Sequence, residues 1–305
     1  MRQLLMLLPA LALLLPQPAV AAVRVVTSLQ DFASLAQTVG GKRVEAFSLA
    51  KGYQDPHFVE PKPSFVLKLS RANLLIVAGL EMEIGYLPPL LDQSRNARIR
   101  PGAPGYLDAS AGCEILERPT VTVTRAMGDV HPFGNPHYWL DPRNGRVVAR
   151  AIAAKLSSLD PAGKAEYAAN LARFEADLTA AEKRWDAALL PYAGTELVTY
   201  HNSWPNFLKR FRLVAAGFIE PKPGVPPSPG HIVQLVALMR DKKISVILME
   251  PYFDERTPQS IARKTGAKVL TFIPSVGGVP QAKDYISLFD WDLKILTDAL
   301  KSRKQ

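Results

Sequence analysis

The longest helical pattern in the chain reads DPAGKAEYAANLARFEADLTAAEKRWDAALL and covers residues 160–190. Asp160 followed by Pro161 is a typical helix start, with an N-cap acceptor ahead of a proline in the first turn. Apolar side chains recur at spacings of three and four and therefore share one face: Tyr167, Leu171, Phe174, Leu178, Ala181, Trp185 and Leu189. At 1.5 Å per residue this helix would run roughly 45 Å. The pattern predicts a rigid helix that is long enough to join two lobes.

Short apolar runs alternate with helical stretches on both sides of this helix. Such runs are typical of the buried strands of a parallel sheet with crossover helices, and they cover residues 23–26, 44–47, 74–78, 197–200, 246–249 and 269–272. We therefore predict an α/β fold with two (β/α) sandwich lobes and mainly parallel sheets, joined by the long helix. The predicted parts are an N-terminal lobe over 22–143, a helical segment over 144–193 and a C-terminal lobe over 194–305.

Residues 1–21 have the pattern of a cleaved signal peptide. Arg2 precedes an apolar run over 4–15, and small residues at Ala19 and Ala21 suit a cleavage site. The run is shorter than the roughly 20 apolar residues of a membrane span, although a retained anchor is the alternative. The expected mature chain begins near Ala22 without a lipid-bearing cysteine and resides in the periplasm.

Composition excludes several classes of function. The net charge is +9, but the lysines and arginines are scattered and form no extended basic stripe interleaved with aromatic residues, so we predict no nucleic-acid partner. Cys113 is the single cysteine, which excludes an intramolecular disulfide framework and a multi-cysteine zinc site within one chain.

Three of the five histidines stand in conspicuous settings. His57 follows Asp55-Pro56 in a turn after the run 44–47, and His137 follows Asn135-Pro136. His201 comes directly after the run 197–200, at the carboxyl end of a predicted strand, where ligands of open α/β sheets collect. Two lobes facing each other would bring these three imidazoles together.

Three imidazoles and one carboxylate form a closed tetrahedral shell that suits Zn²⁺. Asp55 and Asp141 are candidates to hold the second ring nitrogens of His57 and His137. The alternative is that these are unrelated turn or core histidines, because no two of them share a compact motif such as His-x-x-x-His.

The chain resembles the periplasmic solute-binding protein family 9, the ZnuA-like zinc and manganese receptors of ABC importers. The resemblance covers nearly all of the mature chain and rests on five motifs in order: DPH at 55–57 with PKPS at 61–64, GDVHP at 128–132, NPHYWLDP at 135–142, YHNSW at 200–204 and MEPYF at 249–253. It implies two lobes with a metal between them, and His57, His137 and His201 as its nitrogen ligands. In this family a histidine at the third position goes with zinc and a glutamate with manganese.

Two departures from the family pattern concern the fourth ligand. The family's aspartate after the last long strand has no counterpart in residues 270–275, so Glu250 is the predicted substitute. The alternatives are that Glu250 supports a ligand or the fold without touching the metal, and that a water closes the shell. The histidine-rich loop of many zinc receptors is reduced here to His131, either a remnant of metal capture or an ordinary loop histidine. His231 is expected to begin a helix and not to ligate.

The expected function is that of a periplasmic receptor, not an enzyme. It would capture a divalent transition metal as transported ligand, Zn²⁺ in preference to Mn²⁺, and deliver it to an inner-membrane ABC permease. We expect a monomer, and loading by a periplasmic metallochaperone is an open alternative. The competing functions are a zinc metalloenzyme that uses an open three-histidine site with Glu250 as general base, a manganese receptor, and an adhesin of the same fold.

Overall fold

The structure is a computed structural model that describes residues 22–124, 127–128 and 130–302. The predicted signal peptide, residues 1–21, lies outside the described residues. The first sheet has the order β2-β1-β3-β4, and each of its strand pairs is parallel. Its strands are β1 (Val23–Thr27), β2 (Val44–Ser48), β3 (Leu74–Val77) and β4 (Tyr106–Asp108).

The second sheet repeats this arrangement with the order β6-β5-β7-β8, again with parallel pairs. Its strands are β5 (Glu196–Thr199), β6 (Val214–Phe218), β7 (Val246–Met249) and β8 (Lys268–Thr271). The predicted fold class is confirmed, as are the six predicted strands. The prediction missed β4, which has only three residues, and β6, whose small residues leave it partly exposed.

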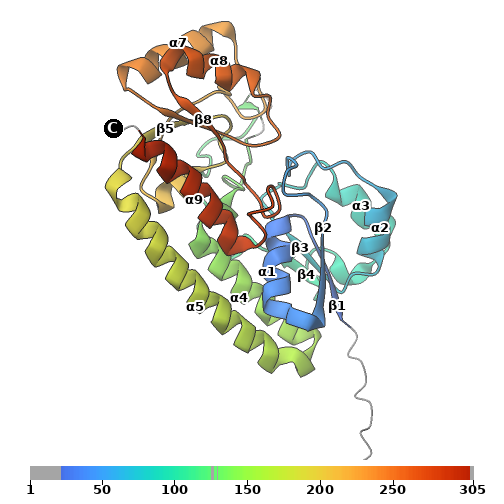
Figure 1. Ribbon diagram of the computed structural model, residues 1–305. Coiled ribbons are helices and arrows are strands. Elements are labelled where there is room, and N and C mark those ends of the chain that lie inside the picture. Colours follow the sequence, from blue (N-terminus) through green and yellow to red (C-terminus); the bar gives the residue numbers. More distant parts are fainter. Residues whose placement is uncertain (1–21, 125–126, 129, 303–305) are drawn as a thin grey trace, which may run out of the picture.

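Helices between the strands make the crossovers that parallel pairing requires. Those of the first lobe are α1 (Gln30–Gly40), α2 (Pro63–Ser70) and α3 (Leu87–Ser94), and those of the second are α6 (Pro205–Arg210), α7 (Pro229–Asp241) and α8 (Arg256–Thr265). In Figure 1 the two sheets and their helices form two lobes, with α2 and α3 at the outer side of one and α7 and α8 at the outer side of the other.

The long helix is α5 (Lys164–Leu189), and it packs against α1, against α4 (Pro142–Leu159) and against α9 (Tyr285–Lys301). Figure 1 shows α5 beside α4 and α9, running from the first lobe to the second. Six of its seven predicted core side chains are buried and Leu171 is partly buried. The predicted cap is wrong in detail, because the Asp160 side chain accepts hydrogen bonds from Arg43 and Tyr167 and a 3-10 turn precedes α5.

Direct contacts also join the lobes. The buried carboxylate of Asp31 on α1 accepts hydrogen bonds from the hydroxyl of Ser275 and the backbone N–H of Val276 (3.2 Å to the latter). Trp139 Nε1 donates to the carbonyl of Pro274 (2.9 Å). Helix α9 belongs to the predicted C-terminal lobe by sequence, but it packs on α1 of the N-terminal lobe. The domain limits near 143 and 194 therefore stay a prediction. Within the described residues, no helix is both long and apolar enough to cross a membrane.

Candidate metal site

His57 lies in the loop that follows β2, and its ring is held by a residue two positions earlier. Asp55 Oδ1 accepts from the backbone N–H of His57 (2.9 Å) and from its Nδ1 (2.8 Å). Burial disfavours ionisation of Asp55, but its hydrogen bonds with His57 outweigh burial and lower the pKa of the carboxyl. Asp55 is therefore an acceptor only, so the proton of His57 is on Nδ1 and the lone pair is on Nε2.

His137 repeats this local arrangement with an amide in place of the carboxylate. Asn135 Oδ1 accepts from the backbone N–H of His137 and from its Nδ1, both at 3.0 Å. Asn135 Nδ2 in turn donates to Glu117 (3.0 Å) and to the carbonyl of Asn202 (2.9 Å), which links the two lobes. His137 is only 2% exposed, its burial lowers the pKa of its ring strongly, and its Nε2 is buried without a hydrogen-bond partner.

His201 follows the carboxyl end of β5 and belongs to the second lobe. Its Nδ1 contacts Glu220 Oε2 at 2.7 Å, from the loop after β6, and its backbone carbonyl accepts from Thr199 (2.8 Å). Burial opposes a proton on this ring, but the hydrogen bond with Glu220 and the negative charges of Glu250, Glu220 and Asp55 together outweigh burial and raise the pKa of His201. Asp55 accepts from a ring nitrogen, as predicted. The other predicted acceptor, Asp141, instead caps α4 through the N–H of Arg143 (2.8 Å), and Asn135 is the acceptor for the ring of His137.

The structure brings the three predicted histidines into one cluster. Their ring centres are 5.2 Å (His57–His137), 5.8 Å (His57–His201) and 5.7 Å (His137–His201) apart. One nitrogen from each lies within 4.8 Å of the others. Among the residues that the structure describes, these three are the group of histidine, cysteine, aspartate and glutamate side chains that could hold a metal ion.

Glu250, the predicted fourth ligand, lies outside this group of three. It follows β7, is fully buried, and accepts from Trp204 Nε1 (3.0 Å) through Oε1. Its Oε2 is buried and unpaired among the described residues, and burial raises the pKa of the carboxyl to about 7. The role of Glu250 as a ligand stays a prediction.

His131 is closer to the cluster than the sequence indicated. Its ring centre is 5.4 Å from that of His57, its Nδ1 donates to the carbonyl of Leu80 (2.9 Å), and its Nε2 is buried without a partner. His231 differs, because its Nε2 is the engaged nitrogen and donates to the carbonyl of Phe218 (2.9 Å). His231 also lies in the first turn of α7, as predicted.

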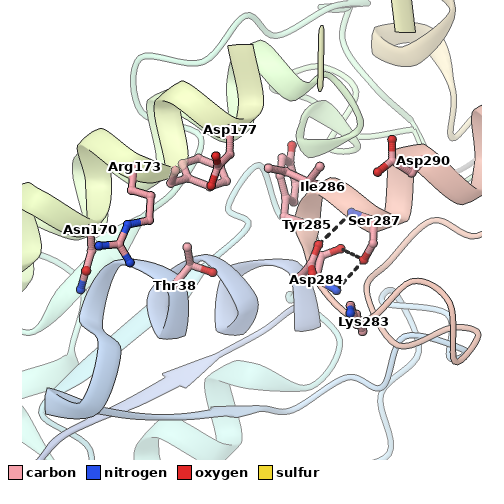
Figure 2. Close-up of a pocket in the computed structure, with 11 residues that line it drawn as sticks. Thr38, Asn170, Arg173, Asp177, Lys283, Asp284, Tyr285, Ile286, Ser287 and Asp290 are labelled. Carbon is pink, nitrogen blue, oxygen red and sulfur yellow. Dashed lines mark hydrogen bonds between the residues drawn. The ribbon is translucent and has the colours of Figure 1, made fainter. Parts of the chain in front are cut away.

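A cavity of about 430 Å³ opens beside the cluster. His57 and His131 line it together with apolar side chains that include Phe58, Met82 and Ile84. A second cavity, of about 500 Å³, lies among α1, α5 and α9 (Figure 2). None of the histidines lines that second cavity, and its Asp284 is engaged in capping α9 through the N–H of Ser287 (2.8 Å).

Two parallel-sheet lobes, a long joining helix and a histidine cluster where the lobes meet are the features of a two-lobed binding protein with a candidate metal site. The model of one family matches residues 25–299, and its description is ZnuA, zinc-uptake complex component A, periplasmic. The chain belongs to this family.

Relatives with curated names and solved structures agree with this assignment. The manganese ABC transporter substrate-binding lipoprotein PsaA of Streptococcus pneumoniae is 26% identical over 287 residues, 91% of this chain and 88% of that protein. A ZnuA deletion mutant with zinc bound has a TM-score of 0.75 at 27% identity, covering 92% of this chain and 96% of that one. FpvC of Pseudomonas aeruginosa with Ni²⁺ shares the fold, with a TM-score of 0.76 at 20% identity and coverage of 92% and 98%.

Proposed function

We propose that this chain is a periplasmic receptor that captures Zn²⁺ with His57, His137 and His201 and delivers it to the inner-membrane permease of an ABC importer. The observation that carries this proposal is the cluster of three imidazoles whose ligand atoms lie within 4.8 Å of one another. Membership of the family described as zinc-uptake component A supports the transport role. Export directed by residues 1–21 and action as a monomer belong to the same proposal.

The spacing of the rings supports a small tetrahedral ion. Imidazoles bound to zinc at about 2.0–2.1 Å would have ring centres about 5 Å apart, close to the separations of 5.2–5.8 Å between the three rings. The donors are nitrogens, which suit zinc, whereas manganese prefers carboxylate, carbonyl and water oxygens. Zinc is therefore the favoured cargo.

The hydrogen-bond partners of the three histidine rings orient them to bind the metal ion. Asp55, Asn135 and Glu220 each engage an Nδ1, so the rings need no change of tautomer or orientation to present Nε2. Asp55 and Glu220 also place two carboxylates within hydrogen-bond distance of ligand rings, which offsets the charge of a dication. At His137 the ion would supply the partner that the buried Nε2 lacks.

A manganese receptor is the second candidate, and its support is the relative PsaA, which is named for manganese. The glutamate that typifies manganese receptors in this family is replaced here by His201. Competition between the two ions for the purified protein separates these candidates.

The test is elemental analysis of the purified mature chain, together with a zinc competition titration and a parallel manganese titration. We expect one tightly bound zinc per chain, lost in the His201→Ala variant and kept in the matched control His231→Ala. Preference for manganese would establish the second candidate. Absence of measurable affinity for either ion would overturn the receptor proposal.

A further inference from the structure

His131 has the features of a metal ligand although it lies outside the group of three. At His57, His137 and His201 the engaged nitrogen is Nδ1, and the same nitrogen is engaged at His131. A backbone carbonyl accepts hydrogen bonds and cannot donate, so Leu80 fixes the proton of His131 on Nδ1 and leaves a lone pair on Nε2. This is the tautomer that ligating histidines adopt when their second nitrogen contacts a carbonyl.

The Nε2 atom of His131 has no partner although it is buried. An unpaired buried polar atom costs free energy comparable to a lost hydrogen bond, so its position calls for an explanation. The separation of 5.4 Å between the His131 and His57 ring centres falls within the 5.2–5.8 Å of the other three pairs. The fifth histidine, His231, uses its Nε2 on a carbonyl and has none of these features.

The backbone conformation around Leu80 fixes the position of the carbonyl that accepts from His131. Gly79, Leu80 and Glu81 all have positive φ angles, of 74°, 55° and 66°, a conformation that is unfavourable for the two residues with side chains. Glu83 stabilises this turn after β3, because its carboxylate accepts from the N–H groups of Ala78 (2.6 Å) and Gly79 (3.2 Å). The turn thus holds the acceptor that orients His131.

We propose that His131 is the fourth ligand of the bound ion, so that four imidazole Nε2 atoms close the metal shell in place of Glu250 or a water. This inference rests on the proposed function, since it concerns the same ion. The imidazole of His131 must approach His137 and His201 to join them, because the three-histidine group does not include it in the structure. His131 and His57 line the same cavity, so the fourth ligand lies on the side of the cluster that opens to solvent.

The competing candidate is Glu250, which also has an unpaired buried atom, Oε2. Its other oxygen accepts a hydrogen bond from the buried indole of Trp204. Binding through Glu250 would give a shell of three nitrogens and one oxygen, whereas binding through His131 gives four nitrogens. The two arrangements therefore differ in a property that can be measured on the unaltered protein.

The experiment loads the full mature chain with Zn²⁺ and counts the bound imidazoles from the outer-shell multiple scattering of their rings in X-ray absorption at the zinc edge. The variants are His131→Asn, which keeps an N–H donor for the Leu80 carbonyl but has no imidazole, Glu250→Gln, and the matched control His231→Asn. We expect four imidazole nitrogens in the wild type, and three nitrogens with one oxygen in His131→Asn. We also expect zinc affinity roughly tenfold or more weaker in His131→Asn, with the other two variants unchanged.

A wild-type shell of three nitrogens and one oxygen would overturn the proposal, whatever the variants do. An unchanged shell and affinity in His131→Asn would overturn it as well, and an altered shell in Glu250→Gln would then assign the ligand to Glu250. The His201→Ala variant separates this failure from that of the proposed function. Zinc binding that needs His201 but not His131 refutes only the fourth ligand, whereas a wild type without zinc affinity refutes the receptor itself.

Discussion

Each clustered histidine has an acceptor on Nδ1, and the choice of acceptor gives the site its local electrostatics. Asp55 and Glu220 are carboxylates, Asn135 is a neutral amide and Leu80 contributes a backbone carbonyl. At His57 and His137 the acceptor is two residues earlier and also receives the backbone N–H, with a proline between. This repeated unit, Asp/Asn-Pro-His, orients a ring with three consecutive residues.

Replacement of Asn135 tests this orientation. Asn135→Ala removes the acceptor for two N–H groups of His137, so the ring loses its fixed orientation. We expect zinc affinity to fall by roughly 10- to 100-fold, the usual effect of removing a group that holds a ligand. The measurement is a competition titration with a zinc chelator. Asn170→Ala, which removes a distant hydrogen bond to Val39 (3.0 Å), is the control and should bind as the wild type does.

Helix α5 joins the lobes through one apolar face. The buried residues on this face include Phe174, Leu178 and Trp185. Ion pairs from Arg146 and Arg150 of α4 to Glu182 and Glu175 add contacts at its partly exposed edge. Because exposed ion pairs contribute little, packing of the apolar face supplies most of the stability of this helix in the fold.

Truncation on the two sides of this region should therefore have different effects. Leu178 is fully buried, so Leu178→Ala should lower the free energy of unfolding by roughly 2–5 kcal/mol. Leu190, in the turn after α5, is 64% exposed, and Leu190→Ala should change that energy by less than about 0.5 kcal/mol. Urea unfolding followed by circular dichroism compares them. Equal losses would show that α5 is not held by its buried face.

Two sets of buried contacts restrict movement of the two lobes relative to each other. α5 packs on α1, α4 and α9, and Asp31 of the first lobe binds Ser275 and Val276 beyond β8. A wide hinge motion would break these buried contacts. Metal binding should therefore change the molecule by a modest rotation or by local rearrangement near the histidines.

Solution scattering with and without zinc tests this expectation. The radius of gyration should be nearly the same in both states, because the joining helix and the contacts of Asp31 persist. The His201→Ala variant, measured with zinc, controls for effects of the ion outside the site. A marked contraction of the wild type on zinc binding would contradict a rigid connection between the lobes.

The same inter-lobe contact predicts a pH dependence of stability. Burial raises the pKa of Asp31 from 3.8 to about 6, so between these values the folded protein holds a proton that the unfolded chain releases. The contribution of Asp31 to the unfolding free energy therefore falls as pH rises from about 4 to about 6, by up to about 3 kcal/mol. Above pH 6 the ionised, buried carboxylate opposes folding to a constant extent.

Asp31→Asn should remove this contribution and flatten the stability profile of the metal-free protein between pH 4 and pH 7 relative to the wild type. The buried Glu83, Glu250 and Asp292 also have raised pKa values and remain in both proteins, so the difference between the two profiles isolates Asp31. Urea unfolding at several pH values gives both profiles. Parallel profiles would show that Asp31 does not titrate in this range.

Local patterns of the sequence determined the class of fold, six of the strands and the extent of the long helix, and together with the family resemblance they singled out His57, His137 and His201 as candidate ligands. These features depend on periodicity and on residues close together in the chain, such as the buried face of α5 and the Asp-Pro-His and Asn-Pro-His units. The sequence prediction missed β4 because it is very short, and it missed β6 because that strand has few large apolar residues.

Which groups hold the rings across long sequence separations depends on how the folded chain packs. Glu220 contacts His201 from 19 residues away and Leu80 contacts His131 from 51 residues away, and no spacing in the sequence encodes either distance. The same holds for the burial of Glu250 against Trp204 and for the approach of His131 to His57. Residue types and spacing predict which side chains have the chemistry to bind a metal, but packing of two separate lobes determines which of their atoms meet.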